Sequence, residues 1–206
     1  LKDLQEKEKT IARTYHYGEQ LEMNLKVAQD MVTNLRINHH FLFNTLNSMA
    51  SIALDDGSYD LYSAIIDLSR MFRYTMRSDL RFVELESEIL YIKNYLNLQK
   101  LRYGDALKVK YLIPEKLYNL SVPFNFIQPI VENAFTHGFR DIDTEKRIEI
   151  IARLDSQYAI IEIHNNGTIL DGNNIDKIKA GIRSNNGHGL SLIYTKFTSA
   201  YGNNFD

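Results

Sequence analysis

The hydrophobic pattern of the chain changes near residue 103, and this change constrains the fold more than any other feature. Before it, apolar residues recur at helical spacing; after it, short segments alternate between apolar and polar residues, as strands do. The sequence therefore predicts a helical half followed by an α+β half, with a boundary near residues 103–106. With 206 residues, 44% of them hydrophobic, the chain is long enough for one or two domains.

Residues 1–36 contain no proline and follow a seven-residue repeat. Most of the positions on its seam are Leu, Ile or Val, whereas Lys7 and Gly18 weaken the pattern. The repeat predicts a coiled coil of moderate quality, with an ordinary amphipathic helix packed on its own domain as the alternative. Continuing the same register places His39 on the seam, together with Leu42, Leu46 and Met49, and places His40 one step off it, toward solvent.

The rest of the first half predicts two more helices. The first helix should stop at the turn cluster of residues 55–58, and a second should follow with apolar residues at helical spacing from Leu61 to Phe72. A third should run from about residue 84 to residue 102 and end at Tyr103-Gly104. Two helices joined by a short loop predict an antiparallel hairpin, and two copies of it would form a four-helix bundle.

The second half predicts strands at residues 107–114, 147–154 and 158–165, the last two forming a hairpin around Ser156. Between the first two, residues 122–139 read as a helix. Pro123 would lie near its first turn, and Pro129 would kink or restart it. A last helix should begin at Gly189. Both ends of the sequence suggest a piece of a longer protein.

Charge and composition exclude several classes of function. The formal net charge is −2, so no basic field points to nucleic acid or to an anionic membrane. The absence of cysteine excludes disulfide frameworks and thiolate metal sites. No apolar run approaches the ~20 residues that a membrane-spanning helix needs.

The segment QPIVENAFTHGF, residues 128–139, combines side chains suited to phosphate chemistry. Glu132 and Asn133 are adjacent, and His137 follows Asn133 by four residues, on the same helical face. An Asn oxygen is a suitable ligand for Mg²⁺, and a neighbouring carboxylate can act as a general base. Taken alone, the segment fits a solvated helix face equally well.

Two glycine-containing segments follow. HNNG, residues 164–167, ends a strand, and Gly167 would let the backbone turn or approach a flat ligand. NNGHGL, residues 185–190, runs into a helix, where Gly187 and Gly189 would expose backbone N–H groups to an anion. Each segment alone is also typical of an ordinary turn or loop.

The order of these segments resembles the ATP-binding domain of the GHKL group, which includes histidine kinases, gyrase, Hsp90 and MutL. By this resemblance Glu132, Asn133, His137 and Gly138 form the N-box, Asn165 to Gly167 the first glycine box, and Gly187 to Leu190 the second. Residues 168–186 would form a lid over the phosphates.

A segment of the first half resembles a second family motif. RINHHFLFNTLNSM, residues 36–49, resembles the phosphoacceptor box Q-I-N-P-H-F-L-F-N-T-L-N of LytS/YesM-type sensor histidine kinases, and the resemblance runs from about residue 35 to residue 201.

The resemblance implies a domain order and a reaction. Residues 1–36 would be a signalling coiled coil and residues 37–103 the dimerisation and phosphotransfer helices with a linker helix. Residues 104–206 would be a C-terminally truncated GHKL domain, an α/β sandwich.

The implied reaction transfers a phosphate to a histidine. His40 would accept the γ-phosphate of ATP, and His39 stands where the family pattern has proline. Asn133 would hold Mg²⁺, Glu132 is a candidate base, and the residues expected to contact ATP are Asn133, His137, Asn165, Gly167, Gly187, Gly189 and Leu190.

The same resemblance implies the partners and the setting. The chain would be a homodimer that passes phosphate to an Asp of a response-regulator receiver domain, with no nucleic-acid partner. It would be the cytoplasmic part of a bacterial membrane sensor, attached through segments outside this sequence.

Three positions depart from the family pattern. Asn165 replaces the Asp that accepts a hydrogen bond from adenine, Ile169 replaces the second glycine of the first box, and Leu192 replaces an Asn. We therefore expect adenine binding that is weakened but retained. The alternatives are a dimeric nucleotide-binding or degenerate scaffold without phosphotransfer, and a GHKL ATPase that transfers phosphate to water, which the histidine box disfavours.

Overall fold

The computed structural model describes residues 40–76, 80–140, 142–169, 181–182, 189–202 and 204–205. The chain divides into two compact units between Tyr62 and Ser63. The predicted coiled coil of residues 1–36, His39, Gly187 and most of the predicted lid lie outside the described residues.

In the first unit, residues 40–55 form a helix that ends at the predicted turn cluster, and α2 (Tyr59–Thr75) begins directly after it. Gly57 has a φ of 76°, a left-handed conformation that lets the chain turn between the two helices. Leu46, Ala50 and Ala53 are buried, whereas Met49, predicted on the seam, is 50% exposed in the single chain. The buried face thus follows the helical spacing i, i+4, i+7.

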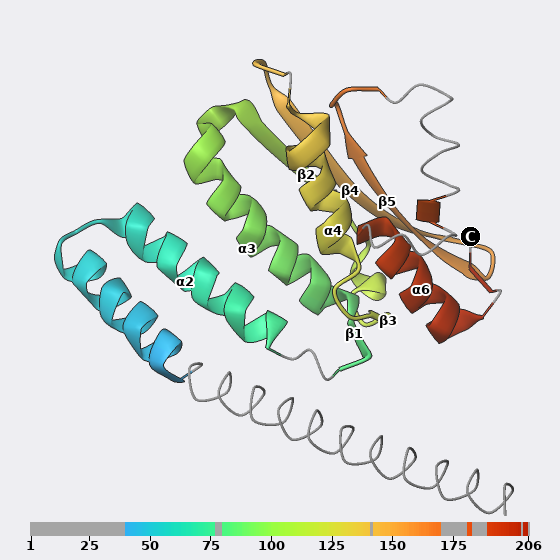
Figure 1. Cartoon of the computed structure of the whole chain (residues 1–206), viewed down its shortest axis with the longest axis horizontal. Coiled ribbons are helices and arrows are strands. Elements are labelled where there is room, and N and C mark those ends of the chain that lie inside the picture. The colour runs from blue at the N-terminus through green and yellow to red at the C-terminus, as the bar shows by residue number, and fades with distance from the viewer. Residues whose placement is uncertain are drawn as a thin grey trace, which may run out of the picture. The chain divides into compact units, whose positions relative to one another are not determined.

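The described residues of the second unit form two sheets (Figure 1). β1 (Phe82–Glu84) pairs antiparallel with β3 (Ser121–Pro123). β2 (Leu107–Leu112), β4 (Lys146–Asp155) and β5 (Tyr158–Asn165) form a three-stranded sheet in the order β2-β4-β5, parallel between β2 and β4 and antiparallel between β4 and β5.

Three helices lie against one face of the larger sheet: α3 (Leu85–Tyr103), α4 (Ile127–Asn133) and α6 (Gly189–Tyr201) (Figure 1). A π-helical turn, Ala134–Gly138, continues α4. Short 3-10 turns cover Gly104–Ala106 and Glu115–Leu117. The prediction of a helical part followed by an α/β part is confirmed.

The core lies between the helices and this face of the sheet. Ile148, Ile150 and Ala152 alternate along β4 and are buried together with Leu85, Ile89 and Ile92 of α3. The side chains on the other face of the strands include the ion pairs Lys110–Glu149 (3.9 Å) and Arg153–Glu162 (3.4 Å). The sheet therefore has one face packed against helices and one face that carries charges.

The predicted helix over residues 122–139 is wrong in its first part. Val122 belongs to β3, where it pairs with Val83, and α4 begins only at Ile127. Asn125 has a φ of 54°, a conformation that no helix contains. Pro129 is the third residue of α4, where no intrahelical N–H bond is lost, so the helix neither kinks nor restarts there.

The β4–β5 hairpin forms as predicted, with Asp155 paired to Tyr158 across a two-residue turn. Ser156 in that turn has a φ of 53°. None of the helices that the structure describes is long and apolar enough to span a membrane.

Candidate functional site

α4 and its π-helical continuation present the predicted N-box residues. Asn133, the last residue of α4, is half-buried, and its side chain makes no hydrogen bond to any described residue. His137 is exposed on the π-helical turn, which Phe139 closes by donating from its N–H to the carbonyl of Ala134 at 2.8 Å. An unpaired amide next to an irregular helical turn leaves donor and acceptor groups available to a ligand.

The end of this turn contacts the first predicted glycine segment. Thr168 donates from its backbone N–H to the carbonyl of Gly138 at 2.8 Å, and Gly167 donates to the side-chain oxygen of Asn165 at 2.9 Å. A Cβ placed on Gly167 would lie 2.6 Å from backbone atoms of Gly138. The chain can therefore make this approach only without a side chain at residue 167.

Asn165 lies at the end of β5, in register with Ile148, which faces the helices. Its side-chain oxygen contacts both glycines: a Cβ on Gly138 would lie 3.0 Å from it. Among the described residues, one donor bonds this oxygen, the N–H of Gly167, and a carbonyl oxygen can accept two hydrogen bonds. Asn165 thus keeps an acceptor site and its amide donors for a ligand.

Asn166 has a structural role that the sequence did not predict. Its side chain accepts from the N–H of Arg147 at 2.6 Å and donates to the carbonyl of Glu145 at 2.8 Å. These bonds extend the pairing of β4 and β5 past Asn165 and fix the direction in which the chain leaves the sheet. An Asn directly after a strand is the available signal, because Asn side chains often replace backbone partners at such points.

The start of α6 packs against α4. A Cβ on Gly189 would lie 3.2 Å from the Cβ of Pro129, so the second predicted glycine segment also reaches α4. Leu190 is half-buried, and the buried Ser191 donates to the carbonyl of Gly181 at 3.3 Å. The first predicted glycine segment thus contacts the π-helical turn after α4, and the described part of the second contacts the start of α4.

Residues 28–107 match the protein-family model for histidine kinases. This region of the chain belongs to the histidine kinase family.

Curated relatives of this family cover most of the chain. It is 29% identical over 170 residues to the sensor histidine kinase BtsS of Escherichia coli strain K12, a match that covers 82% of this chain and 28% of BtsS. It is 29% identical over 189 residues to the sensor protein LytS of Streptococcus agalactiae, covering 86% of this chain and 32% of LytS. The chain therefore spans about a third of the length of these relatives.

A solved histidine kinase domain, from the blue-light activated histidine kinase EL346 of Erythrobacter litoralis, aligns over 66% of this chain and 75% of its own length. The sequence identity is 11% and the TM-score is 0.37.

His40 lies in the first unit, at the start of the described part of the helix that ends at residue 55, and its side chain is exposed. An imidazole that reacts with a phosphate must be accessible to the domain that binds the phosphate donor. The exposure of His40 meets this requirement.

Glu132, unlike Asn133, is hydrogen-bonded within α4 and lies near two tyrosines of α3. Its carboxylate accepts from the side-chain amide of Gln128 at 2.6 Å. It also lies near Tyr91 and Tyr95 of α3; burial, and after it the Glu132 charge, raise the pKa of both phenols. Glu132 is therefore oriented by its own helix and by α3.

The described residues fit a nucleotide with a divalent cation. The side-chain amide of Asn133 makes no hydrogen bond to a described residue, and that of Asn165 makes one, through its oxygen. Gly138 and Gly167 add a surface without side chains. No group of three His, Asp or Glu side chains among the described residues could hold a metal ion. A Mg²⁺ ion here would therefore depend on Asn133 and on phosphate oxygens.

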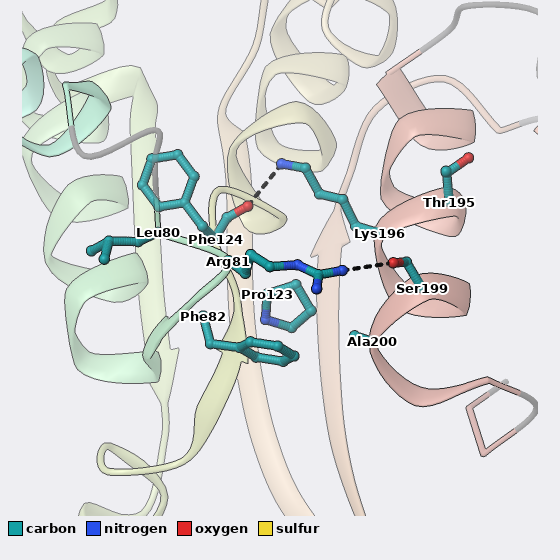
Figure 2. Close-up of a pocket in the computed structure, with 9 residues that line it drawn as sticks. All are labelled: Leu80, Arg81, Phe82, Pro123, Phe124, Thr195, Lys196, Ser199 and Ala200. Carbon is teal, nitrogen blue, oxygen red and sulfur yellow. Dashed lines mark hydrogen bonds between the residues drawn. The ribbon is translucent and has the colours of Figure 1, made fainter.

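A cavity of about 440 Å³ lies elsewhere, between the β1–β3 strands and the C-terminal half of α6 (Figure 2). Arg81 donates to the hydroxyl of Ser199 across it at 3.0 Å. No predicted site residue lines this cavity.

Proposed function

We propose that the chain is the kinase core of a two-component sensor, in which ATP phosphorylates His40 and the phosphate then passes to an Asp of a response regulator. The observation that supports this proposal is the contact of the first glycine segment with Gly138 of the N-box, and of Gly189 with Pro129 at the start of the same helix, in a chain whose phosphoacceptor region belongs to the histidine kinase family.

Each site residue has a proposed role. Asn165 would contact adenine, and Asn133 would hold the cation. Gly167 would let the protein backbone approach the nucleotide, and Gly189 at the start of α6 would let it approach the phosphates. Gly187, Leu190 and His137 would line the rest of the site around the phosphates. Mg²⁺, when bound, would neutralise charge on the phosphate oxygens.

The transfer itself needs little covalent chemistry from the protein. An imidazole nitrogen of His40 bonds to the γ-phosphorus, and the bond from that phosphorus to the bridging oxygen of ADP breaks. The imidazole proton passes to a base, for which Glu132 is the candidate. The remaining contribution is positioning and charge stabilisation.

The finer architecture is part of the same proposal. A sheet with helices on one face supports a GHKL-type sandwich for residues 104–206. Residues 1–36 would form a signalling coiled coil, and residues 37–103 a helical hairpin that dimerises into a four-helix bundle. The whole protein would be a membrane sensor with this part in the cytoplasm.

Labelling tests the proposal directly. The protein is incubated with Mg²⁺ and γ-labelled ATP, and acid-labile, alkali-stable label is measured for the wild type, His40→Gln and His39→Gln, with the exposed His164→Gln as a matched control. We expect label in all except His40→Gln. Label that persists in His40→Gln would refute the assignment of the acceptor.

A second candidate is a dimeric nucleotide-binding scaffold without phosphotransfer. The substitutions at Asn165 and Ile169 favour it, and the Ile169 side chain is 92% exposed where relatives have glycine. Nucleotide binding without label, in a longer chain as well as in this one, would support the scaffold over the kinase.

A further inference from the structure

The turn that leads into α4 is held by side chains from two other helices. The Glu88 carboxylate of α3, 2% exposed, accepts from the backbone N–H groups of Asn125, Phe126 (3.0 Å) and Ile127 (3.2 Å). Lys196 of α6 donates to the carbonyls of Phe124 (2.8 Å) and Asn125 (3.2 Å). Figure 2 shows Lys196 reaching the Phe124 carbonyl from α6.

A third helix, α2, joins these contacts through Tyr74. Its hydroxyl donates to the Glu88 oxygen that also accepts from Asn125. Its ring packs against Phe124 and against Tyr91, with 4.9 Å between centroids in both cases. A buried residue of α2 therefore touches both the carboxylate and the turn that fix the start of α4.

The hydrogen bonds of Glu88 and Lys196 involve charged groups that have lost contact with water, so breaking them is energetically unfavourable. Burial raises the pKa of Glu88, and burial lowers that of Lys196. A buried carboxylate loses its water and depends on the donors that surround it. The position of the first turn of α4 therefore depends on all of the donors, including the hydroxyl of Tyr74.

We propose that Tyr74 and Glu88 are positioning residues that couple α2 to α4. The inference rests on the proposed function, because α4 carries Glu132 and Asn133 and because α2 directly follows the helix of His40 in the chain. A displacement of α2 changes the Tyr74–Glu88 contact, and through it the first turn of α4. Since coupling between two sites is reciprocal, a ligand bound at α4 also stabilises the end of α2.

Hydrogen exchange measures this coupling without requiring catalysis. Amide exchange is recorded with and without Mg²⁺ and a non-hydrolysable ATP analogue, in the wild type and in Tyr74→Phe, which keeps the ring but removes the hydroxyl. Tyr111→Phe is the matched control, because Tyr111 is a half-buried tyrosine on β2 that makes no described contact with α4.

In the wild type and in Tyr111→Phe, the nucleotide should slow exchange in the last turn of α2, residues 71–75, severalfold. In Tyr74→Phe this protection should be lost while protection of α4 is retained. A purely structural role for Tyr74 would leave the protection of α2 intact, and that outcome would overturn the proposal.

The same variants separate this proposal from the kinase assignment. Without nucleotide, Tyr74→Phe should speed exchange at residues 125–127 by about tenfold, because one of the charged hydrogen bonds of Glu88 is lost. Unchanged exchange there would refute the coupling even if the wild type labels His40. Nucleotide binding without label, in a longer chain as well as in this one, would refute the kinase function, whereas the exchange at residues 125–127 would still test the coupling through Tyr74 and Glu88.

Discussion

Gly167 approaches Gly138 so closely that a Cβ on Gly167 would lie 2.6 Å from the Cα and the carbonyl carbon of Gly138. Neither atom can move aside as a flexible side chain would, since both belong to the backbone. The contact joins the end of β5 to the end of the π-helical turn, the two segments that carry Asn165 and His137.

Replacing Gly167 by Ala should separate these two segments. We expect nucleotide affinity to fall by about tenfold or more and the free energy of unfolding to fall by about 1–3 kcal/mol, because added volume in a tight contact shifts the backbone. Titration with a fluorescent ATP analogue and chemical unfolding measure the two effects. Ala106→Ser is the control, because it also adds one heavy atom but at an exposed position; equal effects of both variants would contradict the interpretation.

Asn165→Asp introduces the acidic side chain that the GHKL pattern has at this position. We expect tighter nucleotide binding, by about 1 kcal/mol or somewhat more, because a charged acceptor forms a stronger hydrogen bond with the adenine amine. Calorimetric titration measures the change. An unchanged or lower affinity would count against contact between this residue and adenine.

Asn166→Ala should affect stability more than ligand binding. Its side chain makes two hydrogen bonds, to the backbone of Arg147 and of Glu145, and their loss should lower the free energy of unfolding by about 1–3 kcal/mol. Chemical unfolding checks this, with the exposed neighbour His164→Ala as the control. A loss no larger than that of His164→Ala would show that the two bonds contribute little.

Glu88 should make stability depend on pH in a defined direction. Because burial raises its pKa in the folded state, protonation of Glu88 favours folding. Its contribution is therefore fully present below the unfolded-state pKa of about 4.5 and is lost as pH rises through the higher folded-state pKa.

The measurement compares unfolding of the wild type and Glu88→Gln between pH 4.5 and pH 8. The stability of the wild type relative to the variant should fall as pH rises through this window. A relative stability that rises with pH would mean that the hydrogen bonds to the carboxylate outweigh its burial.

Local patterns predicted the elements whose periodicity lies within one segment. The apolar spacing in α3 and the alternation in β4 and β5 require only neighbouring residues, and the structure contains these elements close to the predicted bounds. By contrast, residues 121–126 contain apolar residues that suit a helix, but Val122 pairs with Val83 and the N–H of Phe126 bonds Glu88, 38 residues away. No local pattern contains such partners.

The candidate site shows the same division. The order of the motifs predicted that the segments around Asn133, Gly167 and Gly189 act together; the structure has Gly167 in contact with Gly138 and Gly189 in contact with Pro129, and their joint action stays a prediction. The sequence did not predict the bonds of Asn166 or the contact of Tyr74 with Glu88. Each of these contacts joins residues that are at least 14 positions apart in the sequence, and only the packing of the whole unit brings them together.

The two-residue turn between β4 and β5 also has a consequence for the order of folding. A hairpin with so short a loop closes within about 1–10 μs, whereas the parallel pairing of β2 with β4 must first enclose β3 and α4. We therefore expect the hairpin to form in the folding transition state and the surroundings of α4 to form after it. Ile150→Val on β4 should then slow folding, and Val131→Ala on α4 should mainly speed unfolding. Stopped-flow kinetics that gave this result would show that the candidate site forms after the β4–β5 hairpin.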